Sequence, residues 1–350
     1  MSRILFVLLF AIQFVFAQKP SRVDKKLAGA LQKHVYFLAS DELQGRRAGD
    51  PGETTASNYI AEQFKKNGLT PKGTVDYFQP FTINDGRKVD ESTNIKINGK
   101  TLEYGKDFEI LSNSSMGHIS GDASPAIQES GQPWFIDLSD AIEENKENPH
   151  FDLNNLLTDK IKFNGKEKSD LTPIPSAFIN KAAKDKYLSD LSSTYQIEAT
   201  ISLSPKIRNT RNVVGYINNG APLTVVIGAH LDHLGYGEDG NSMLRNAAPA
   251  IHNGADDNAS GTSSLIELSA ILKKSKQKNY NYLLIAFSAE ELGLNGSKYF
   301  VENPTISLNN INYMINMDMV GRLNDSSKTI TLGGYGTSPA WKNMIDGVEE

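Results

Sequence analysis

The sequence contains no cysteine, and this absence excludes several classes of protein. A chain without cysteine forms no disulfide framework, carries no lipid on a cysteine and binds no metal through thiolates. Basic side chains are also not in excess, because 36 Lys and Arg face 41 Asp and Glu for a formal net charge of -5. Without a basic cluster, nothing indicates a nucleic-acid partner. No repeat and no low-complexity tract is present.

A long apolar run is missing as well, although the N-terminus carries a short one. Arg3 supplies a positive charge, Ile4 to Phe16 form an apolar segment, and Ala17 completes a plausible cleavage site. The segment is shorter than the roughly 20 residues that a spanning helix needs, which disfavours the alternative of a membrane anchor. We predict that residues 1–17 are a signal peptide, and that the mature protein is secreted or periplasmic without stable membrane insertion.

The 350 residues have an ordinary globular composition, with 39% hydrophobic and 22% charged side chains, and their length suggests two domains. Apolar residues at helical spacing predict helices over Val23–Ser40 and Thr54–Asn67. Between them, the glycines and proline of SDELQGRRAGDPGE predict a turn that exposes Arg46 and Arg47.

The pattern changes between residues 84 and 205, where short alternating segments such as TNIKING and PWFIDLSD are separated by polar turns. IPSAFINKAAKDKYLSDL predicts a strand followed by a helix. His118 and His150 lie in this region without a neighbouring acidic cluster, so we do not expect them to bind metal. We predict that residues 18–83 and 206–350 form one domain, and that 84–205 form a smaller β-rich domain inserted into it.

Apolar strands alternate with amphipathic helices in the second half of the chain. This alternation is typical of a doubly wound, mostly parallel α/β sheet flanked by helices. The predicted strands are Arg211–Tyr216, Leu223–Ala229, Tyr282–Phe287, Ile311–Met317 and Thr329–Gly333, and the predicted helices are Thr262–Leu272, Gly293–Glu302 and one from Ser338 onward.

Acidic and histidine side chains follow several of these strands, at the sheet edge where such folds bind ligands. They lie in the segments GAHLDHLG, IHNGADDNASG, SAEELG and NMDMVG. Gathered carboxylates would repel one another and resist burial unless cations lay between them. Imidazole and carboxylate ligands without cysteine suit a hydrolytic zinc site. The adjacent Glu290 and Glu291 point in different directions, so one can bind metal while the other accepts a proton.

These four segments, over roughly Thr224 to Gly321, resemble the zinc-dependent exopeptidases of clan MH, which include bacterial leucyl aminopeptidases and the glutamate carboxypeptidase type. The resemblance implies the zinc-exopeptidase fold, related to phosphorylases and hydrolases, and two zinc ions. It also implies a cis peptide after the bridging carboxylate, and it relates residues 84–205 to the protease-associated domain. The implied roles are a first-zinc ligand for His230, a carboxylate holding His230 for Asp232, the bridge for Asp257, the general base for Glu290, a second-zinc ligand for Glu291 and a first-zinc ligand for Asp318.

The second zinc site is incomplete in this sequence. The family adds a histidine near the C-terminal end of the catalytic domain, and no histidine follows His252. We expect either that the natural protein continues past Glu350 or that the second metal is weak or absent. His233 and His252 match no ligand of the family and are interpreted as structural. Asp257 is preferred to Asp256 as the bridge because of its spacing.

The sequence therefore predicts a secreted zinc metallopeptidase, an aminopeptidase that hydrolyses N-terminal peptide bonds of peptide or protein substrates. Three alternatives stay open: a carboxypeptidase of the glutamate carboxypeptidase type, a glutaminyl cyclase-like enzyme with one zinc, and a catalytically inactive binding relative. The side-chain preference and the oligomeric state have no readable signal in the sequence.

Overall fold

The computed structural model describes residues 21–111, 114–123, 175–190, 192–244, 250–323 and 331–345, together with residues 326 and 329. The predicted signal peptide, the strand pattern of PWFIDLSD and His150 lie outside the described residues. None of the described helices combines the length and the apolar character needed to cross a bilayer.

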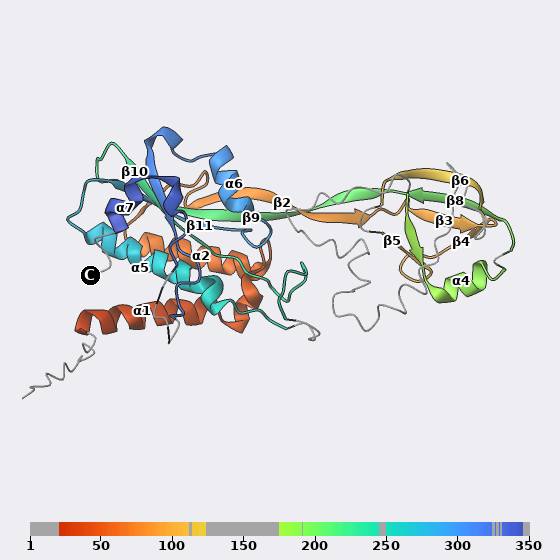
Figure 1. Ribbon diagram of the computed structural model, residues 1–350, viewed down its shortest axis with the longest axis horizontal. Coiled ribbons are helices and arrows are strands. Elements are labelled where there is room, and N and C mark those ends of the chain that lie inside the picture. Colours follow the sequence, from red (N-terminus) through yellow and green to blue (C-terminus); the bar gives the residue numbers. More distant parts are fainter. Residues whose placement is uncertain are drawn as a thin grey trace, which may run out of the picture.

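The first part of the molecule is built on a six-stranded sheet (Figure 1). Its strands, in the order of hydrogen-bonded neighbours, are β1 (Thr70–Pro71), β9 (Leu203–Ile217), β11 (Asn281–Phe287), β10 (Thr224–His230) and β12 (Ile311–Asn316), with β2 (Phe78–Val89) paired to β9 beside this path. Strand β10 is parallel to both β11 and β12, whereas β9 is antiparallel to β11. The predicted α/β sheet, parallel where the site lies, is confirmed.

A helix follows each of the first two parallel strands and returns the chain for the next one. Helix α5 (Gly261–Lys274) follows β10, and α6 (Asn295–Glu302) follows β11. In Figure 1, α5 lies with α1 (Arg22–Leu38) and α2 (Pro51–Lys66) below the sheet, and α6 lies above it. Helices thus cover both faces, as in a doubly wound fold.

The two covered faces explain why the central strands are apolar without alternation. Along β11, Leu284 and Ala286 belong to the hydrophobic cluster between the sheet and helices α1, α2 and α5. Leu283, Ile285 and Phe287 belong to the cluster on the opposite face, with Phe300 of α6. Successive side chains of a strand point to opposite faces, so nearly every residue of β11 is buried. This rigid centre carries the ends of β10, β11 and β12 to one edge.

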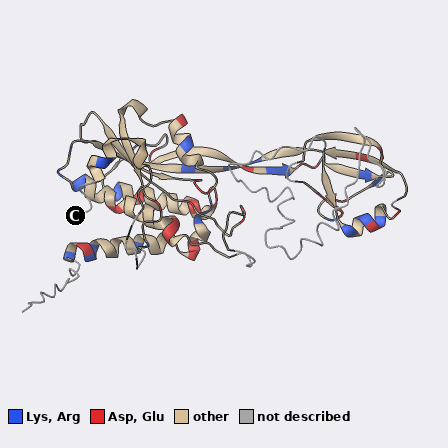
Figure 2. Cartoon of the chain, viewed as in Figure 1, with Lys and Arg blue, Asp and Glu red and all other residues tan. Residues whose placement is uncertain are grey.

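Strands β2 and β9 are long and run from the first part of the molecule to the second (Figure 1). The second part contains a four-stranded sheet, a two-stranded sheet and a hydrophobic cluster of its own around Ile97, Phe108 and Ile110. Its elements are β3 (Asn94–Ile97), β4 (Lys100–Thr101), β5 (Phe108–Ile110), β6 (Gly117–Ala123), β7 (Ala177–Ile179), α4 (Lys181–Tyr187) and β8 (Tyr195–Ile201). The strand and helix predicted from IPSAFINKAAKDKYLSDL are β7 and α4. Basic and acidic residues are interspersed over both parts (Figure 2).

The shorter elements complete the described chain. They are η1 (Asp41–Arg46), η4 (Ala255–Ser260), η5 (Leu308–Asn310), η6 (Tyr335–Thr337) and α7 (Ala340–Ile345), of which α7 confirms the last predicted helix. The prediction of a strand at Thr329–Gly333 is wrong for the residues described there, which are irregular. Among the described strands, β12 pairs only with β10 and is therefore the last strand at this edge of the sheet.

The prediction that Arg46 and Arg47 are exposed is also wrong. Arg46 is 1% exposed, and the side chain of Arg47 is 12% exposed. Arg46 donates to main-chain carbonyls of neighbouring loops, and Arg47 pairs with Asp239 and Asp85. Contacts with residues far away in the sequence bury both side chains, and local turn signals do not report them.

Candidate metal centre

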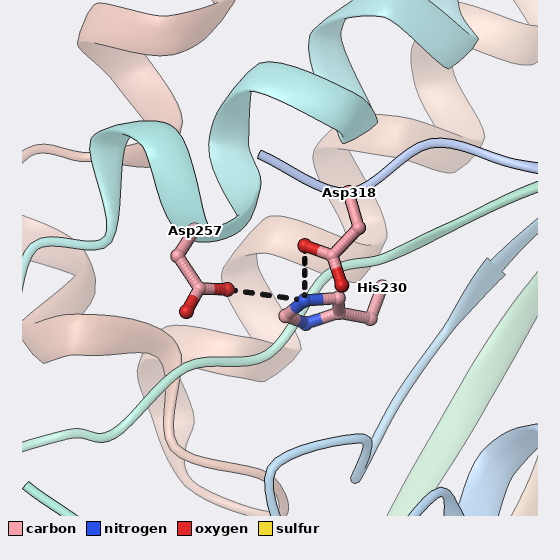
Figure 3. Close-up of side chains that lie close together, drawn as sticks. All are labelled: His230, Asp257 and Asp318. Carbon is pink, nitrogen blue, oxygen red and sulfur yellow. Dashed lines mark ion pairs between the residues drawn. The ribbon is translucent and has the colours of Figure 1, made fainter. Parts of the chain in front are cut away.

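Three predicted ligands meet at the carboxyl edge of the sheet. His230 ends β10, Asp257 lies in η4 before α5, and Asp318 lies two residues beyond β12. The Nε2 atom of His230 is 3.1 Å from Oδ1 of Asp257 and 3.4 Å from Oδ1 of Asp318. In Figure 3 both carboxylates point to the same ring nitrogen. One potential ligand atom from each residue lies within 4.8 Å of the others.

A second group shares Asp257 with the first. It consists of Asp257, Glu291 and His233, with ligand atoms again within 4.8 Å of one another. Nδ1 of His233 is 2.6 Å from Oε1 of Glu291 and 3.9 Å from Oδ2 of Asp257. The two oxygens of Asp257 therefore face different histidines. The sequence pointed to Asp257 and Glu291, whereas His233 was interpreted as structural.

Asp232 connects the His230 segment to the glutamate pair. Its carboxylate is fully buried and accepts the main-chain N–H of Glu290 at 3.1 Å and that of Glu291 at 3.3 Å. Nδ1 of His230 lies 3.1 Å from the main-chain oxygen of Asp232 and 3.8 Å from its Oδ1. The nearer partner that orients the ring is thus the carbonyl, and the carboxylate holds the turn that carries Glu290 and Glu291.

Asn258 and Asp256 hold the segment that carries Asp318. The side-chain amide of Asn258 donates to the carbonyl of Met317 at 2.9 Å, and Asp256 accepts the N–H of Gly321 at 2.8 Å. Asp256 therefore contacts the segment after Asp318, whereas the carboxylate of Asp257 lies near His230 and His233. The peptide bond between Asp257 and Asn258 is cis, as the resemblance implied.

The electrostatics of the site follow from crowded carboxylates. Burial opposes the charged form of His230, but the carboxylates of Asp232, Asp257 and Asp318 outweigh it and raise the pKa of His230. The hydrogen bond with His230 in turn lowers the pKa of Asp257. The same carboxylates that favour a proton on His230 also favour a metal cation beside its ring. A metal ion would therefore compete with the proton for His230.

Glu290 belongs to neither group of potential ligands but lies beside them. Burial, reinforced by the charges of Asp232, Glu291 and Asp318 against the opposing effect of His230, raises the pKa of Glu290 to about 7. A carboxyl group that titrates near neutral pH suits proton transfer better than permanent charge does.

The donor set of the first group fits zinc. Zinc accepts imidazole nitrogen and carboxylate oxygen at about 2.0 Å, so two ligands at a tetrahedral angle lie about 3.3 Å apart. The two distances from Nε2 of His230, 3.1 and 3.4 Å, bracket this value. The side chains are therefore spaced as zinc ligands would be, with one ion able to accept all three.

Sequence comparison finds that this part of the chain is similar to known peptidases. Residues 212–347 match the sequence model of Peptidase family M28. The aminopeptidase YwaD of Bacillus subtilis is 33% identical over 135 residues, which cover 37% of this chain and 26% of YwaD. A probable zinc metalloprotease of Pyrenophora tritici-repentis is 41% identical over 68 residues, which cover 19% of this chain and 14% of that protein. The chain thus spans about a quarter or less of these relatives.

Structural comparison finds an aminopeptidase from Aneurinibacillus sp. strain AM-1 with a TM-score of 0.43 and 20% identity. The aligned region covers 84% of this chain and 70% of that one.

Proposed function

Because residues 212–347 match the sequence model of Peptidase family M28, we propose that the protein is a zinc-dependent aminopeptidase that removes residues from the N-terminus of peptides. The observation that carries this proposal is the position of Asp257, whose two carboxylate oxygens face the separate histidines His230 and His233. A shared carboxylate between two ligand groups is the arrangement that a two-zinc hydrolase needs.

The proposed ligands divide between two ions. The first zinc would be held by His230, Asp257 and Asp318. The second would be held by Asp257 and Glu291, and among the described residues His233 would supply its imidazole ligand. When bound, zinc supplies Lewis-acid chemistry, because it polarises a carbonyl oxygen and acidifies water.

Glu290 is the proposed general base and acid. Its carboxylate takes a proton from the attacking water and returns it to the leaving amine, for which a pKa near neutrality is suited. Asp232 orients the main chain at Glu290 and Glu291 through two hydrogen bonds, so that the base and the adjacent ligand are fixed together. The carboxylates of the site also suit the free α-ammonium group of a peptide, which favours an aminopeptidase over a carboxypeptidase.

We also propose that residues 84–205 form an inserted domain and that residues 1–17 direct export. The insertion is supported by β2 and β9, which lead out of the central sheet side by side into the second part of the molecule. Export is supported by the charged start and apolar run at the N-terminus.

The test replaces Glu290 by Gln in the full chain. Turnover of an aminoacyl chromogenic substrate should fall by about two decades or more, since no carboxylate is left to move the proton. Zinc content should stay unchanged, because Glu290 is in neither ligand group. Glu302→Gln, an exposed glutamate at the end of α6, is the matched control. Wild-type turnover in the Glu290 variant would remove it from this role.

The same assay separates the alternative activities. Peptides blocked at the N-terminus should not be cleaved, peptides blocked at the C-terminus should be, and a peptide with N-terminal glutamine should be hydrolysed rather than cyclised. Cleavage of the N-blocked peptides alone would point to a carboxypeptidase. No turnover of any of them by a zinc-loaded chain would point to a binding protein.

A further inference from the structure

Arg46 lies buried behind the candidate metal centre without a part in the proposed chemistry. It ends η1, where Gln44, Gly45 and Arg46 have φ angles of 47, 70 and 49°. Left-handed backbone at two residues other than glycine is unfavourable and persists only where surrounding structure imposes it. The structure around Arg46 therefore holds this turn in its conformation.

The guanidinium group joins three segments of the chain. Nε donates to the carbonyl of Leu231 at 2.9 Å, and the two Nη atoms donate to the carbonyls of Asn253 at 2.8 Å and Gly254 at 3.0 Å. Nη1 also donates to the carbonyl of Leu38 at the end of α1. All four acceptors are main-chain oxygens. Leu231 follows the ligand His230 directly, and Gly254 precedes the ligand Asp257 by three residues.

The backbone of the same turn strengthens this connection. The carbonyl of Arg46 accepts the N–H of His233 at 3.1 Å, and the carbonyl of Gly45 accepts the N–H of Gly235 at 3.1 Å. A Cβ atom on Gly45 would lie 2.5 Å from the oxygen of Gly235, so only glycine permits the close approach. Side chain and main chain thus hold the same loop after β10.

Arginine is suited to this position in a way that lysine is not. Its planar group presents five donors in a fixed fork, whereas a lysine ammonium is a single point of charge. Burial lowers the pKa of Arg46 to about 10, against the opposing charges of Asp232, Asp257 and Glu291. The group stays charged at neutral pH and places one fixed positive charge behind the carboxylates of the site.

We propose that Arg46 is a positioning residue of the metal centre, which fixes the loop that carries His230 relative to the loop that carries Asp257. This inference rests on the proposed zinc function. Arg46 contacts neither metal nor substrate, and it acts by holding two ligands at the spacing that zinc requires. Supporting groups of this kind orient ligands and thereby tune metal affinity.

The experiment compares wild type, Arg46→Lys and a control, all as the full chain. Arg46→Lys keeps the charge but loses the fork. The control is Arg211→Lys on β9, where the guanidinium donates to the carbonyl of Thr54 and to side chains of α2, away from the site. The readouts are the zinc dissociation constant, measured by competition with a chromophoric chelator, and kcat and KM at saturating zinc.

For Arg46→Lys, we expect the zinc dissociation constant to rise by about 10–100-fold, as for other residues that support metal ligands. kcat should fall more than KM rises, because the ligands are displaced while the substrate site is not. The control should stay within about twofold of wild type in all three constants. A folded Arg46→Lys protein that also stays within about twofold would overturn the inference.

A second variant covers the case in which Arg46→Lys unfolds. Arg46→Ala leaves a cavity that guanidinium ion can enter, and added guanidinium should restore zinc binding while ammonium at equal concentration should not. Equal effects of the two ions would overturn the inference. A wild-type chain that takes up no zinc would overturn the proposed function and this inference together, whereas zinc uptake in wild type beside an unaffected Arg46→Lys overturns the inference alone.

Discussion

Glu53 is a buried carboxyl group that should make stability depend on pH. It lies in α2 with 1% exposure, accepts the hydroxyl of Thr210 at 3.2 Å and lies 3.4 Å from the N–H of Gly49. Burial, reinforced by the charge of Asp232, raises the pKa of Glu53 to about 7 from 4.5. The folded chain therefore keeps this proton at a pH where the unfolded chain has lost it.

The sign and size of the effect follow from that difference. Below pH 4.5, Glu53 is protonated in both the folded and the unfolded chain, so it does not lower the free energy of unfolding. As the pH rises to 7, the unfolded chain gains stability from ionisation that the folded chain does not share, and the free energy of unfolding falls. A difference of about 2.5 pKa units corresponds to about 3 kcal/mol, lost between pH 4.5 and 7 and constant above.

Glu53→Gln removes the titration and keeps a neutral side chain of the same shape. We would measure the free energy of unfolding by urea denaturation followed by circular dichroism, with a chelator present to exclude metal. The free energy of unfolding of the variant minus that of wild type should increase by about 3 kcal/mol between pH 4 and 8. Glu62→Gln, on the exposed side of the same helix, controls for the loss of one carboxyl group. If the gap between Glu53→Gln and wild type changes by less than about 1 kcal/mol over this range, Glu53 is already ionised in the folded chain.

Three further changes probe the loops of the site. Gly45→Ala should lower the free energy of unfolding by more than about 1 kcal/mol, because φ is 70° and a Cβ would meet the oxygen of Gly235; an unchanged melting curve would contradict this. Asn258→Ala should lower the free energy of unfolding by about 2–4 kcal/mol, since the buried N–H of Gly261 and the partly buried carbonyl of Met317 lose their partner, and chemical denaturation measures it; a loss within about 0.5 kcal/mol would refute the contacts. His233→Ala should weaken the second equivalent of zinc in a titration and spare the first; two unchanged equivalents would return His233 to a structural role.

The parts of the fold and site that the sequence predicted depend on local patterns. Apolar runs place the strands β10, β11 and β12, and parallel strands bring their carboxyl ends to one edge. His230, Glu291 and Asp318 each follow such a run within a few residues, so their convergence could be expected. The role of Asp257 followed from the resemblance rather than from a local pattern, and it stays a prediction.

The parts that the sequence did not predict depend on contacts between distant residues. Arg46 is buried by the carbonyls of Asn253 and Gly254, about 200 positions away, and a turn rich in glycine gives no sign of them. His233 reaches Glu291 through a loop whose path depends on that same arginine turn. Its only signal was a position three residues after His230, which did not distinguish a ligand from a packing residue.

The most direct test of the proposed metal centre is the number of zinc ions bound per chain by wild type and by Asp257→Asn after dialysis against buffered zinc. We predict at least one zinc in wild type and almost none in the variant, because Asp257 is the residue common to both ligand groups. No zinc in the folded wild-type chain, or equal zinc in the two proteins, would contradict the claim that these carboxylates and histidines gather around metal.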